Sequence, residues 1–189
     1  ARHHGPRGEV VLRRRMRDGV AVEELIINGA FAIDSSETDT ERLLAEFALP
    51  SGRAHRVLVG GLGLGYTVAA LSALDVDAID VVEIEQCLID WAYQGIAPSI
   101  AAAASDPLVR LHAGDIRLVL EGVIEELVGP WDAIVLDVDN GPDFLIHPHN
   151  RALYTEDSLR AAYAQLAPGG TLAIWCQGLV PALLDRLRA

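Results

Sequence analysis

Three glycines at alternate positions, Gly61, Gly63 and Gly65, follow a short apolar run and precede an alanine-rich segment. This order predicts a strand, a tight turn and a helix. Glycines let such a turn approach a bound molecule closely, because no Cβ intrudes and positive φ angles are allowed. A dinucleotide-binding turn has the spacing G-x-G-x-x-G, but Tyr66 stands where its last glycine would be. The turn is therefore a candidate ligand site, though not one for NAD.

Acidic residues follow the next three apolar runs of the chain. Glu83 ends the second run, Asp115 follows the third, and Asp137 and Asp139 follow the fourth. If these runs are parallel strands, their carboxyl ends meet at one edge of a sheet, where ligands bind. Glu83 could accept hydrogen bonds from both ribose hydroxyls of a nucleoside, and Asp115 could accept one from an adenine amino group. Asp137, supported by Asp139, could take a proton from an amine.

The spacing of Asp137 and Asp139 suggests a working pair. In extended backbone, residues two apart point to the same side, and two neighbouring carboxylates raise the pKa of one of them. Such a pair would suit proton acceptance and would attract a cationic amine. Each acidic residue also has a purely structural interpretation. Glu83 and Asp115 could cap helices, while Asp137 and Asp139 could form the turn before Gly141 and Pro142.

Composition excludes several classes of function. The formal net charge of −12 argues against a nucleic-acid partner and suits a small cationic substrate. No apolar run approaches the roughly 20 residues of a membrane span, so we expect no membrane partner and a cytoplasmic protein. Cys87 and Cys176 are expected to be free thiols. His147 and His149 lack a third ligand at a telling spacing, so we expect no metal.

Alternating strand and helix patterns predict an α/β fold with a doubly wound, mostly parallel sheet of Rossmann-like type. Five strands are each followed by a helix, over residues 57–59 and 66–74, 78–83 and 86–93, 109–112 and 116–127, 133–137 and 156–166, and 171–175 and 180–188. The last helical pattern runs to the end of the chain, so we expect this domain, residues 37–189, to lack its last strands. An open sheet edge of that kind favours association into a homodimer.

A smaller β unit is expected before this domain, over residues 1–36. Two β-rich runs within 22–35 flank Asn28-Gly29, the dipeptide most typical of a two-residue β-hairpin. Residues 1–8 carry no pattern and are expected to be a flexible entry, while residues 9–17 could be an edge strand. A helix over residues 40–48 is expected to connect the β unit to the sheet.

These motifs, taken in order, resemble those of the spermidine synthase (polyamine aminopropyltransferase) family, within the class I AdoMet-dependent transferases. Ile27-Asn28-Gly29 is similar to the Leu-Asp-Gly turn of that family's N-terminal hairpin. Residues 80–85 resemble its ribose-binding strand, and Gly114-Asp115 resembles its adenine-binding pair. Residues 133–137 resemble the strand that carries its catalytic aspartate, and Leu153-Tyr154-Thr155-Glu156 resembles its Leu-Phe-Thr-Glu. The resemblance covers roughly residues 20 to 180.

The resemblance implies a divergent spermidine synthase-like transferase with a role in polyamine biosynthesis. Such an enzyme moves an aminopropyl group from decarboxylated AdoMet to a small amine. The resemblance implies that Asp137 and Asp139 are catalytic. It also implies donor contacts from the residues that follow the first three strands, which are Gly61, Leu62, Gly63, Gly65, Glu83, Ile84, Gly114, Asp115 and Ile116.

Three segments depart from the family pattern. Gly63 stands where the family has the aspartate that holds the amine of decarboxylated AdoMet, and Thr40-Glu41-Arg42-Leu43 replaces Tyr-x-Glu-Met, whose tyrosine helps to hold the polyamine. The segment 137–142 replaces Asp-Ser-Ser-Asp-Pro. These departures leave AdoMet itself open as the donor. They also leave open an AdoMet-dependent methyltransferase on the same scaffold, or a nucleoside-binding module without turnover.

Overall fold

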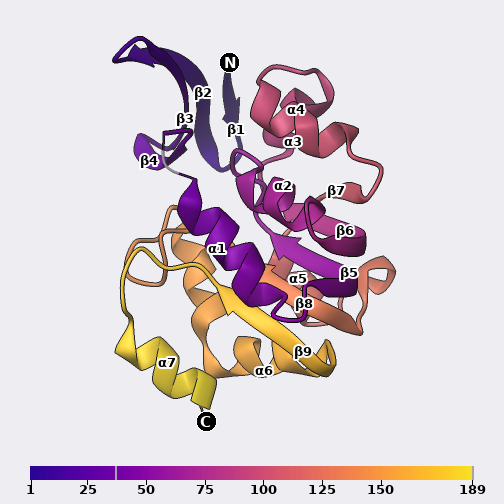
Figure 1. Cartoon of the computed structure of the whole chain (residues 1–189). Coiled ribbons are helices and arrows are strands. Elements are labelled where there is room, and N and C mark those ends of the chain that lie inside the picture. The colour runs from indigo at the N-terminus through magenta and orange to yellow at the C-terminus, as the bar shows by residue number, and fades with distance from the viewer. Residues whose placement is uncertain (37, 189) are drawn as a thin grey trace.

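The computed structural model describes residues 1–36 and 38–188 and contains two β-sheets (Figure 1). Five parallel strands form one sheet in the order β7-β6-β5-β8-β9, and four antiparallel strands form the other in the order β1-β2-β3-β4. The expected α/β fold with a parallel sheet is thus confirmed. No helix among the described residues is long and apolar enough to cross a membrane.

The N-terminal sheet is larger than the hairpin expected from the sequence. Its strands are β1 (Arg2–Gly5), β2 (Gly8–Arg17), β3 (Val20–Ile27) and β4 (Ala30–Asp34). The hairpin at Asn28-Gly29 is confirmed, since both residues have positive φ angles, 52° and 77°. The flexible entry expected over residues 1–8 is wrong, because β1 pairs with β2 along its whole length. Its side chains are almost all exposed, so no apolar pattern marks this strand in the sequence.

The second part of the chain begins with a helix and then alternates between strands and helices. Its elements are α1 (Asp39–Ala48), β5 (Arg53–Gly60), α2 (Tyr66–Ser72), β6 (Asp75–Glu83), α3 (Gln86–Tyr93), α4 (Pro98–Ser105), β7 (Val109–Ala113), α5 (Ile116–Leu120), η1 (Glu125–Leu127), β8 (Trp131–Leu136), η2 (Pro148–Tyr154), α6 (Glu156–Ala164), β9 (Leu166–Ile174) and α7 (Pro181–Arg188).

Two connections of the parallel sheet differ from expectation. The helix expected over residues 116–127 ends at Leu120, because Gly122 adopts a φ of 72°, and a separate 3-10 turn follows at Glu125–Leu127. Between β6 and β7 the chain makes two helices instead of one. The second, α4, begins with Pro98 in its first turn, a position that suits proline because no helical hydrogen bond is lost there.

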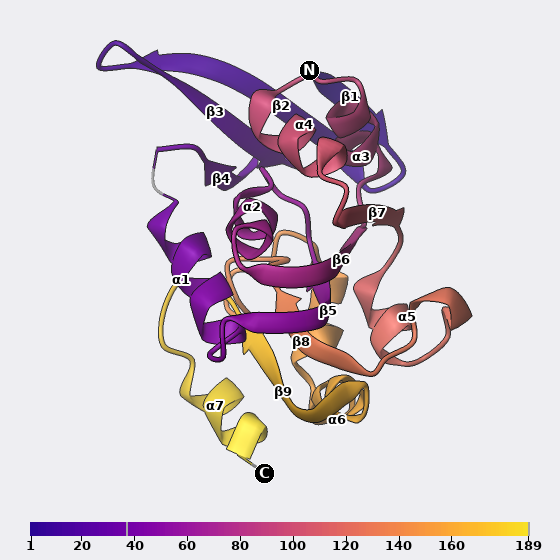
Figure 2. The ribbon, with the colours of Figure 1, turned by 45° about the vertical axis from the view of Figure 1, so that its right-hand side comes forward.

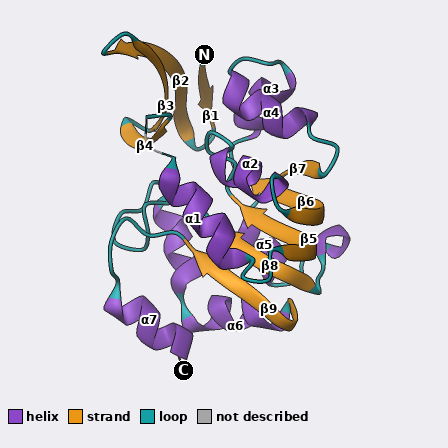
Figure 3. Ribbon diagram, viewed as in Figure 1, coloured by secondary structure: helices purple, strands orange, loops and turns teal. Residues whose placement is uncertain are grey.

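Helices cover both faces of the parallel sheet (Figure 3). Successive residues of a strand point to opposite faces, so Val57 and Val59 pack in one apolar cluster and Leu58 in the other, all fully buried. The first cluster takes in side chains of α1 to α4, and the second takes in side chains of α5 to α7.

The N-terminal sheet packs against the part of the chain that carries α3 and α4 (Figure 2). In α4, the Ser99 hydroxyl donates a hydrogen bond of 2.7 Å to Glu23 of β3. Arg7, in the turn between β1 and β2, donates to the carbonyl of Ile84 and pairs with Glu85 at 3.5 Å. The two sheets therefore meet close to the carboxyl end of β6.

Candidate functional site

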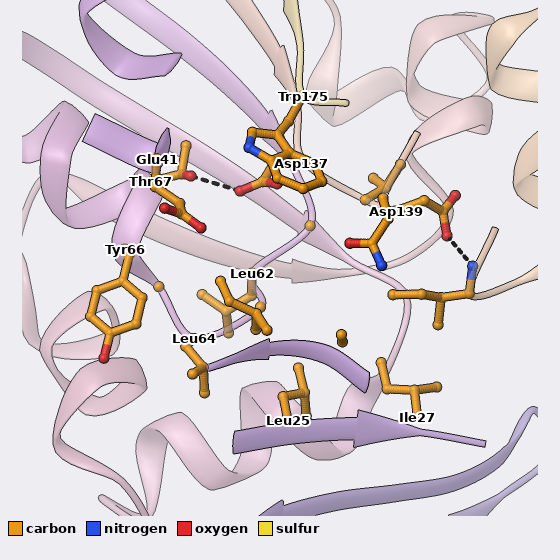
Figure 4. A pocket seen from close by; sticks show the side chains of 18 of the residues that line it. Leu25, Ile27, Glu41, Leu62, Leu64, Tyr66, Thr67, Asp137, Asp139 and Trp175 are labelled. Carbon is orange, nitrogen blue, oxygen red and sulfur yellow. Dashed lines mark hydrogen bonds between the residues drawn. The ribbon is translucent and has the colours of Figure 1, made fainter. Parts of the chain in front are cut away.

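A cavity of about 870 Å³ lies where the carboxyl ends of the parallel strands face the N-terminal sheet (Figure 4). Its size falls within the roughly 300–1,000 Å³ of typical ligand sites. Leu25 and Ile27 of β3 form the wall opposite the strand ends. All residues singled out from the sequence line this one cavity, namely Gly61, Leu62, Gly63, Gly65, Glu83, Ile84, Gly114, Asp115, Ile116, Asp137 and Asp139.

The glycine turn is fixed to its neighbours by backbone contacts. The N–H of Gly61 donates to the carbonyl of Val82 at 2.9 Å, and the carbonyl of Gly60 accepts from the N–H of Asp137 at 2.9 Å. Gly61 has a φ of 93°, and a Cβ at this position would lie 2.1 Å from the carbonyl oxygen of Asp137. A Cβ at Gly63 would meet no heavy atom closer than Ile33 Cγ2, at 4.0 Å, so this glycine faces the cavity.

Glu83 is held in place before any ligand arrives. Its two carboxylate oxygens accept hydrogen bonds from the N–H groups of Leu62 and Glu85, each at 2.7 Å. The side chain is buried, and burial raises the pKa of Glu83 while the backbone donors act in the opposite direction. Each carboxylate oxygen can accept a second hydrogen bond. The arrangement therefore fits a ribose whose hydroxyls donate to Glu83.

Asp115 takes the capping role that the sequence left open, and it also lies in the lining of the cavity. It is the N-cap residue of α5, and its side chain accepts from the N–H of Arg117 at 2.9 Å. It also lines the cavity, next to Gly114 and Ile116. Capping leaves acceptor capacity on the carboxylate, so Asp115 can hold the helix and still accept a hydrogen bond from a base.

Asp137 follows the end of β8 and points toward α2 (Figure 4). The Thr67 hydroxyl donates to Asp137 Oδ2 at 2.6 Å. Burial raises the pKa of Asp137 to about 6, the Thr67 hydrogen bond opposes this, and the charge of Glu41 adds to it. A carboxylate with a pKa in this range can accept a proton near neutral pH without holding it permanently.

Asp139 does not share a side with Asp137. Strand β8 ends at Leu136, so the alternation expected for extended backbone does not apply, and the two side chains point in different directions (Figure 4). Asp139 accepts hydrogen bonds from the N–H groups of Ile146 and His147, at 2.7 and 3.4 Å. Burial raises the pKa of Asp139. Asp139 thus holds the loop that follows β8. The neighbouring carboxylate whose charge raises the pKa of Asp137 is Glu41, and not Asp139 as expected.

Glu41, Thr67 and Trp175 also line the cavity, and none of them was proposed as a site residue from the sequence. Glu41 lies in the first turn of α1, and Thr67 lies in the first turn of α2. Trp175 directly follows β9, and its backbone N–H donates to the carbonyl of Leu136 at 2.9 Å. The position of Trp175 just after a strand was a usable signal. The family resemblance drew attention to residues 40–43 only as a departure, and no local pattern predicts that Glu41 approaches Asp137, since the two lie far apart along the chain.

His147 lies in a buried corner of the same cavity. Its Nε2 is 3.4 Å from Glu85 Oε1, and burial lowers the pKa of this histidine. The ring of His149 is 5.5 Å away, measured between centroids. No group of three or more His, Cys, Asp or Glu side chains among residues 1–36 and 38–188 is arranged to hold a metal ion.

Known proteins with similar sequences are spermidine synthases, at about 30% sequence identity. No family model matches the chain. Spermidine synthase 2 of Hyoscyamus niger is 30% identical over 127 residues, which cover 66% of this chain and 38% of that protein. Spermidine synthase 1 of Datura stramonium is 28% identical over 160 residues, which cover 82% of this chain and 48% of that protein. The chain therefore spans less than half the length of these relatives.

A solved structure extends the likeness to the fold. A spermidine synthase in complex with the transition-state analogue AdoDATO matches with a TM-score of 0.72 and 18% sequence identity. The match covers 92% of this chain and 56% of that one, so it includes at least part of the N-terminal sheet as well as the parallel sheet. Sequence and structure together make this chain a distant homologue of the spermidine synthase (polyamine aminopropyltransferase) family.

Proposed function

We propose that this protein transfers an aminopropyl group from a decarboxylated AdoMet-type sulfonium donor to a small amine. The observation that carries the proposal is the union of two sets of groups in one cavity. One set, with the glycine turn, Glu83 and Asp115, suits a nucleoside, and the other, around Asp137, suits an amine that must lose a proton.

The reaction asks little of the protein beyond positioning and proton acceptance. The amine lone pair forms a bond to the carbon next to the sulfonium, the carbon–sulfur bond breaks, and its electron pair stays on sulfur as a neutral thioether. The new ammonium then loses a proton, and in this proposal Asp137 accepts it, which its place in the cavity lining and its raised pKa support. Holding amine and donor in line is the larger contribution, because it turns a bimolecular encounter into a reaction within one complex.

The charge of the cavity favours the decarboxylated donor over AdoMet. Seven acidic side chains and a single arginine, Arg17, are among the described residues that line it. The acidic residues are Asp34, Asp39, Glu41, Glu83, Asp115, Asp137 and Asp139. A donor with a free carboxylate would need cationic partners, and this lining offers few. Gly63 nevertheless lacks the side chain that holds the donor amine in the family, so methyl transfer from AdoMet is the second candidate.

Product analysis separates these candidates. The protein is incubated with decarboxylated AdoMet or with AdoMet, together with 1,3-diaminopropane, 1,4-diaminobutane or spermidine, and products are identified by mass. We expect a product that gains an aminopropyl group, formed only with the decarboxylated donor. A methyl gain with AdoMet would support the second candidate. Binding of either nucleoside by calorimetry without any product would leave a module that binds but does not turn over.

A further inference from the structure

Asp137 is held by the two segments that flank the glycine turn. Before the turn, the carbonyl of Gly60 accepts from the N–H of Asp137 at 2.9 Å, and a Cβ at Gly61 would lie 2.1 Å from the carbonyl oxygen of Asp137. After the turn, the Thr67 hydroxyl donates to Oδ2 of the same residue at 2.6 Å. The backbone and the side chain of Asp137 are therefore both fixed to the segment that forms the proposed donor site.

Helix α2 places Thr67 for this contact. Thr67 lies in the first turn of the helix and is 3% exposed. A threonine in a helix can bond its hydroxyl to a backbone carbonyl of the preceding turn, but the hydroxyl of Thr67 donates to Asp137 instead (Figure 4). The two residues lie 70 positions apart in the chain. The hydroxyl thus serves a tertiary contact and not the helix itself.

The hydrogen bond leaves the two side-chain oxygens of Asp137 in different surroundings. Oδ2 accepts from Thr67, whereas Oδ1 accepts no hydrogen bond from the part of the chain that the structure describes. Asp137 lines the cavity, and a carboxylate oxygen without a partner keeps its full capacity to accept. Oδ1 is therefore the oxygen available to a substrate.

The other groups around Asp137 disfavour its ionised form. Burial raises the pKa of Asp137 to about 6, and the charge of Glu41 in α1 acts in the same direction. Burial also raises the pKa of Tyr154 in η2, and the charge of Asp137 adds to this effect, so this neighbour is neutral near pH 7. No ion pair among residues 1–36 and 38–188 includes Asp137. The hydrogen bond from Thr67 is the interaction that lowers the pKa of Asp137.

We propose that Thr67 is a positioning residue for proton acceptance, whose hydroxyl occupies Oδ2, turns Oδ1 toward the substrate and stabilises the ionised carboxylate. This inference rests on the proposed aminopropyl transfer and assigns a role to a residue that does not itself receive the proton. A neutral donor suits this role better than a cation. An arginine or lysine beside Asp137 would favour the charged form so strongly that the carboxylate would become a poor base.

The ionisation of Asp137 can be followed by NMR of its side-chain carboxyl carbon in protein with isotopically labelled aspartate, and the Asp137→Asn variant identifies the signal. Thr67→Val keeps the shape of the side chain without the hydroxyl. We expect it to move the titration midpoint of Asp137 up by about 1 to 2 pH units, the scale of a hydrogen bond to a charged group. Thr67→Ala should give the same shift, which provides a second variant if valine disturbs the packing of α2. Thr67→Ser keeps the hydroxyl and should retain the wild-type midpoint.

The pH dependence of kcat gives a readout that a purely structural role would not move. The acidic limb of Thr67→Val should move up with the midpoint of Asp137, so kcat at pH 7 should fall roughly 2- to 10-fold. Affinity for 5′-methylthioadenosine, the nucleoside product, should stay within about twofold. Because the hydroxyl acts through the carboxylate, adding Thr67→Val to Asp137→Asn should cause no further loss of kcat. A further loss of the same size would show that Thr67 acts independently of Asp137.

Thr171→Val is the matched control. Thr171 lies in β9 and is not among the described residues that line the cavity, so its substitution should change neither the midpoint of Asp137 nor kcat. The inference is overturned if the midpoint is unchanged in Thr67→Val, if Thr67→Ser shifts it as far as valine does, or if Thr171→Val has the same effect.

The two readouts separate this inference from the proposed function. If the NMR midpoint moves as expected but no aminopropyl product forms with any amine, the proposed function fails and the hold of Thr67 on Asp137 stands. If product forms and the midpoint of Asp137 is the same in wild type and Thr67→Val, the function stands and the role of Thr67 fails.

Discussion

The two ends of the cavity hold their carboxylates in different ways; we propose that one end, around Glu83 and Asp115, binds a nucleoside and that the other, around Asp137 and Glu41, binds an amine. At the nucleoside end, Glu83 accepts from two backbone N–H groups and Asp115 from one, so both side chains are oriented by the fold itself. At the amine end, Asp137 and Glu41 each accept from a single neutral hydroxyl. Among the described residues, the carboxylates of the first end are held by backbone donors, whereas those of the second end have no cationic partner, and we infer that a cationic ligand would supply one.

This difference suggests that the two ends of the cavity have different functions. Groups fixed by backbone donors cost little to use, because they do not reorganise when the ligand arrives. Buried carboxylates without cations store an unfavourable energy that a cationic ligand relieves. We therefore infer that the nucleoside end supplies orientation and the amine end supplies selectivity and proton acceptance.

Asp137→Asn is the strongest test of the amine end. Asparagine cannot accept the proton, so turnover should fall about 100-fold or more, the usual scale for loss of a general base. Affinity for 5′-methylthioadenosine should change little. Asp139→Asn is the comparison, because its amide oxygen can still accept from the N–H of Ile146, and its loss should be smaller. Equal losses in both variants would favour a purely structural role for the loop.

Glu83→Ala is the corresponding test of the nucleoside end. Loss of a charge-assisted hydrogen bond costs about 1.5–3 kcal/mol, so affinity for 5′-methylthioadenosine should fall roughly 10- to 100-fold. Affinity for 1,4-diaminobutane, measured without nucleoside, should not change. A variant that binds nucleoside as tightly as the wild type would contradict the assignment of Glu83 to the ribose.

The pH dependence of turnover should report Asp137. Its pKa is raised to about 6, and only the ionised form accepts a proton, so turnover should fall about tenfold per pH unit below pH 6. Glu41→Gln removes a charge that raises this pKa, so its profile should move to lower pH. A profile with the same midpoint in both proteins would contradict the coupling of Glu41 and Asp137.

The free energy of unfolding should also depend on pH through Asp137. Because its pKa is higher in the folded state, the folded state favours protonated Asp137, and this stabilising contribution is lost as pH rises from about 4 to 6.

Substitutions at Asp115 should have the smallest effects on nucleoside affinity, and they should distinguish its role as the cap of α5 from its proposed contact with the nucleoside base. Asparagine keeps both the helix cap and an acceptor oxygen, so Asp115→Asn should change nucleoside affinity by less than about fivefold. Alanine removes the cap of α5, so Asp115→Ala should also lower stability by about 1 kcal/mol. Thermal denaturation and calorimetry on the same samples measure both. If asparagine were as harmful as alanine, the charge of Asp115 would matter more than its geometry.

The residues of the proposed nucleoside end, which all line one cavity, could be found from the sequence because their signals are local. Each of its residues lies in a turn directly after a strand, where parallel topology brings all strand ends together. The same logic placed Asp137 in the cavity. It predicted the wrong partner for Asp137, because strand alternation was extended past Leu136, where β8 ends.

The amine end depends on contacts that no local pattern contains. Glu41 reads as an ordinary acidic residue in the first turn of a helix, and only tertiary packing turns it toward Asp137. Strand β1 was missed for a related reason. It is an exposed edge strand, held by its register with β2, from Arg2 opposite Val11 to Gly5 opposite Gly8, and not by an apolar face of its own.

The wall opposite the strand ends comes from the N-terminal sheet, through Leu25 and Ile27 of β3, whereas the proposed nucleoside contacts come from residues 61–116. One wall of the cavity is thus encoded in a different stretch of the chain from the proposed nucleoside contacts. Substitutions along β3 could therefore change the shape of the cavity while the residues at the strand ends stay the same.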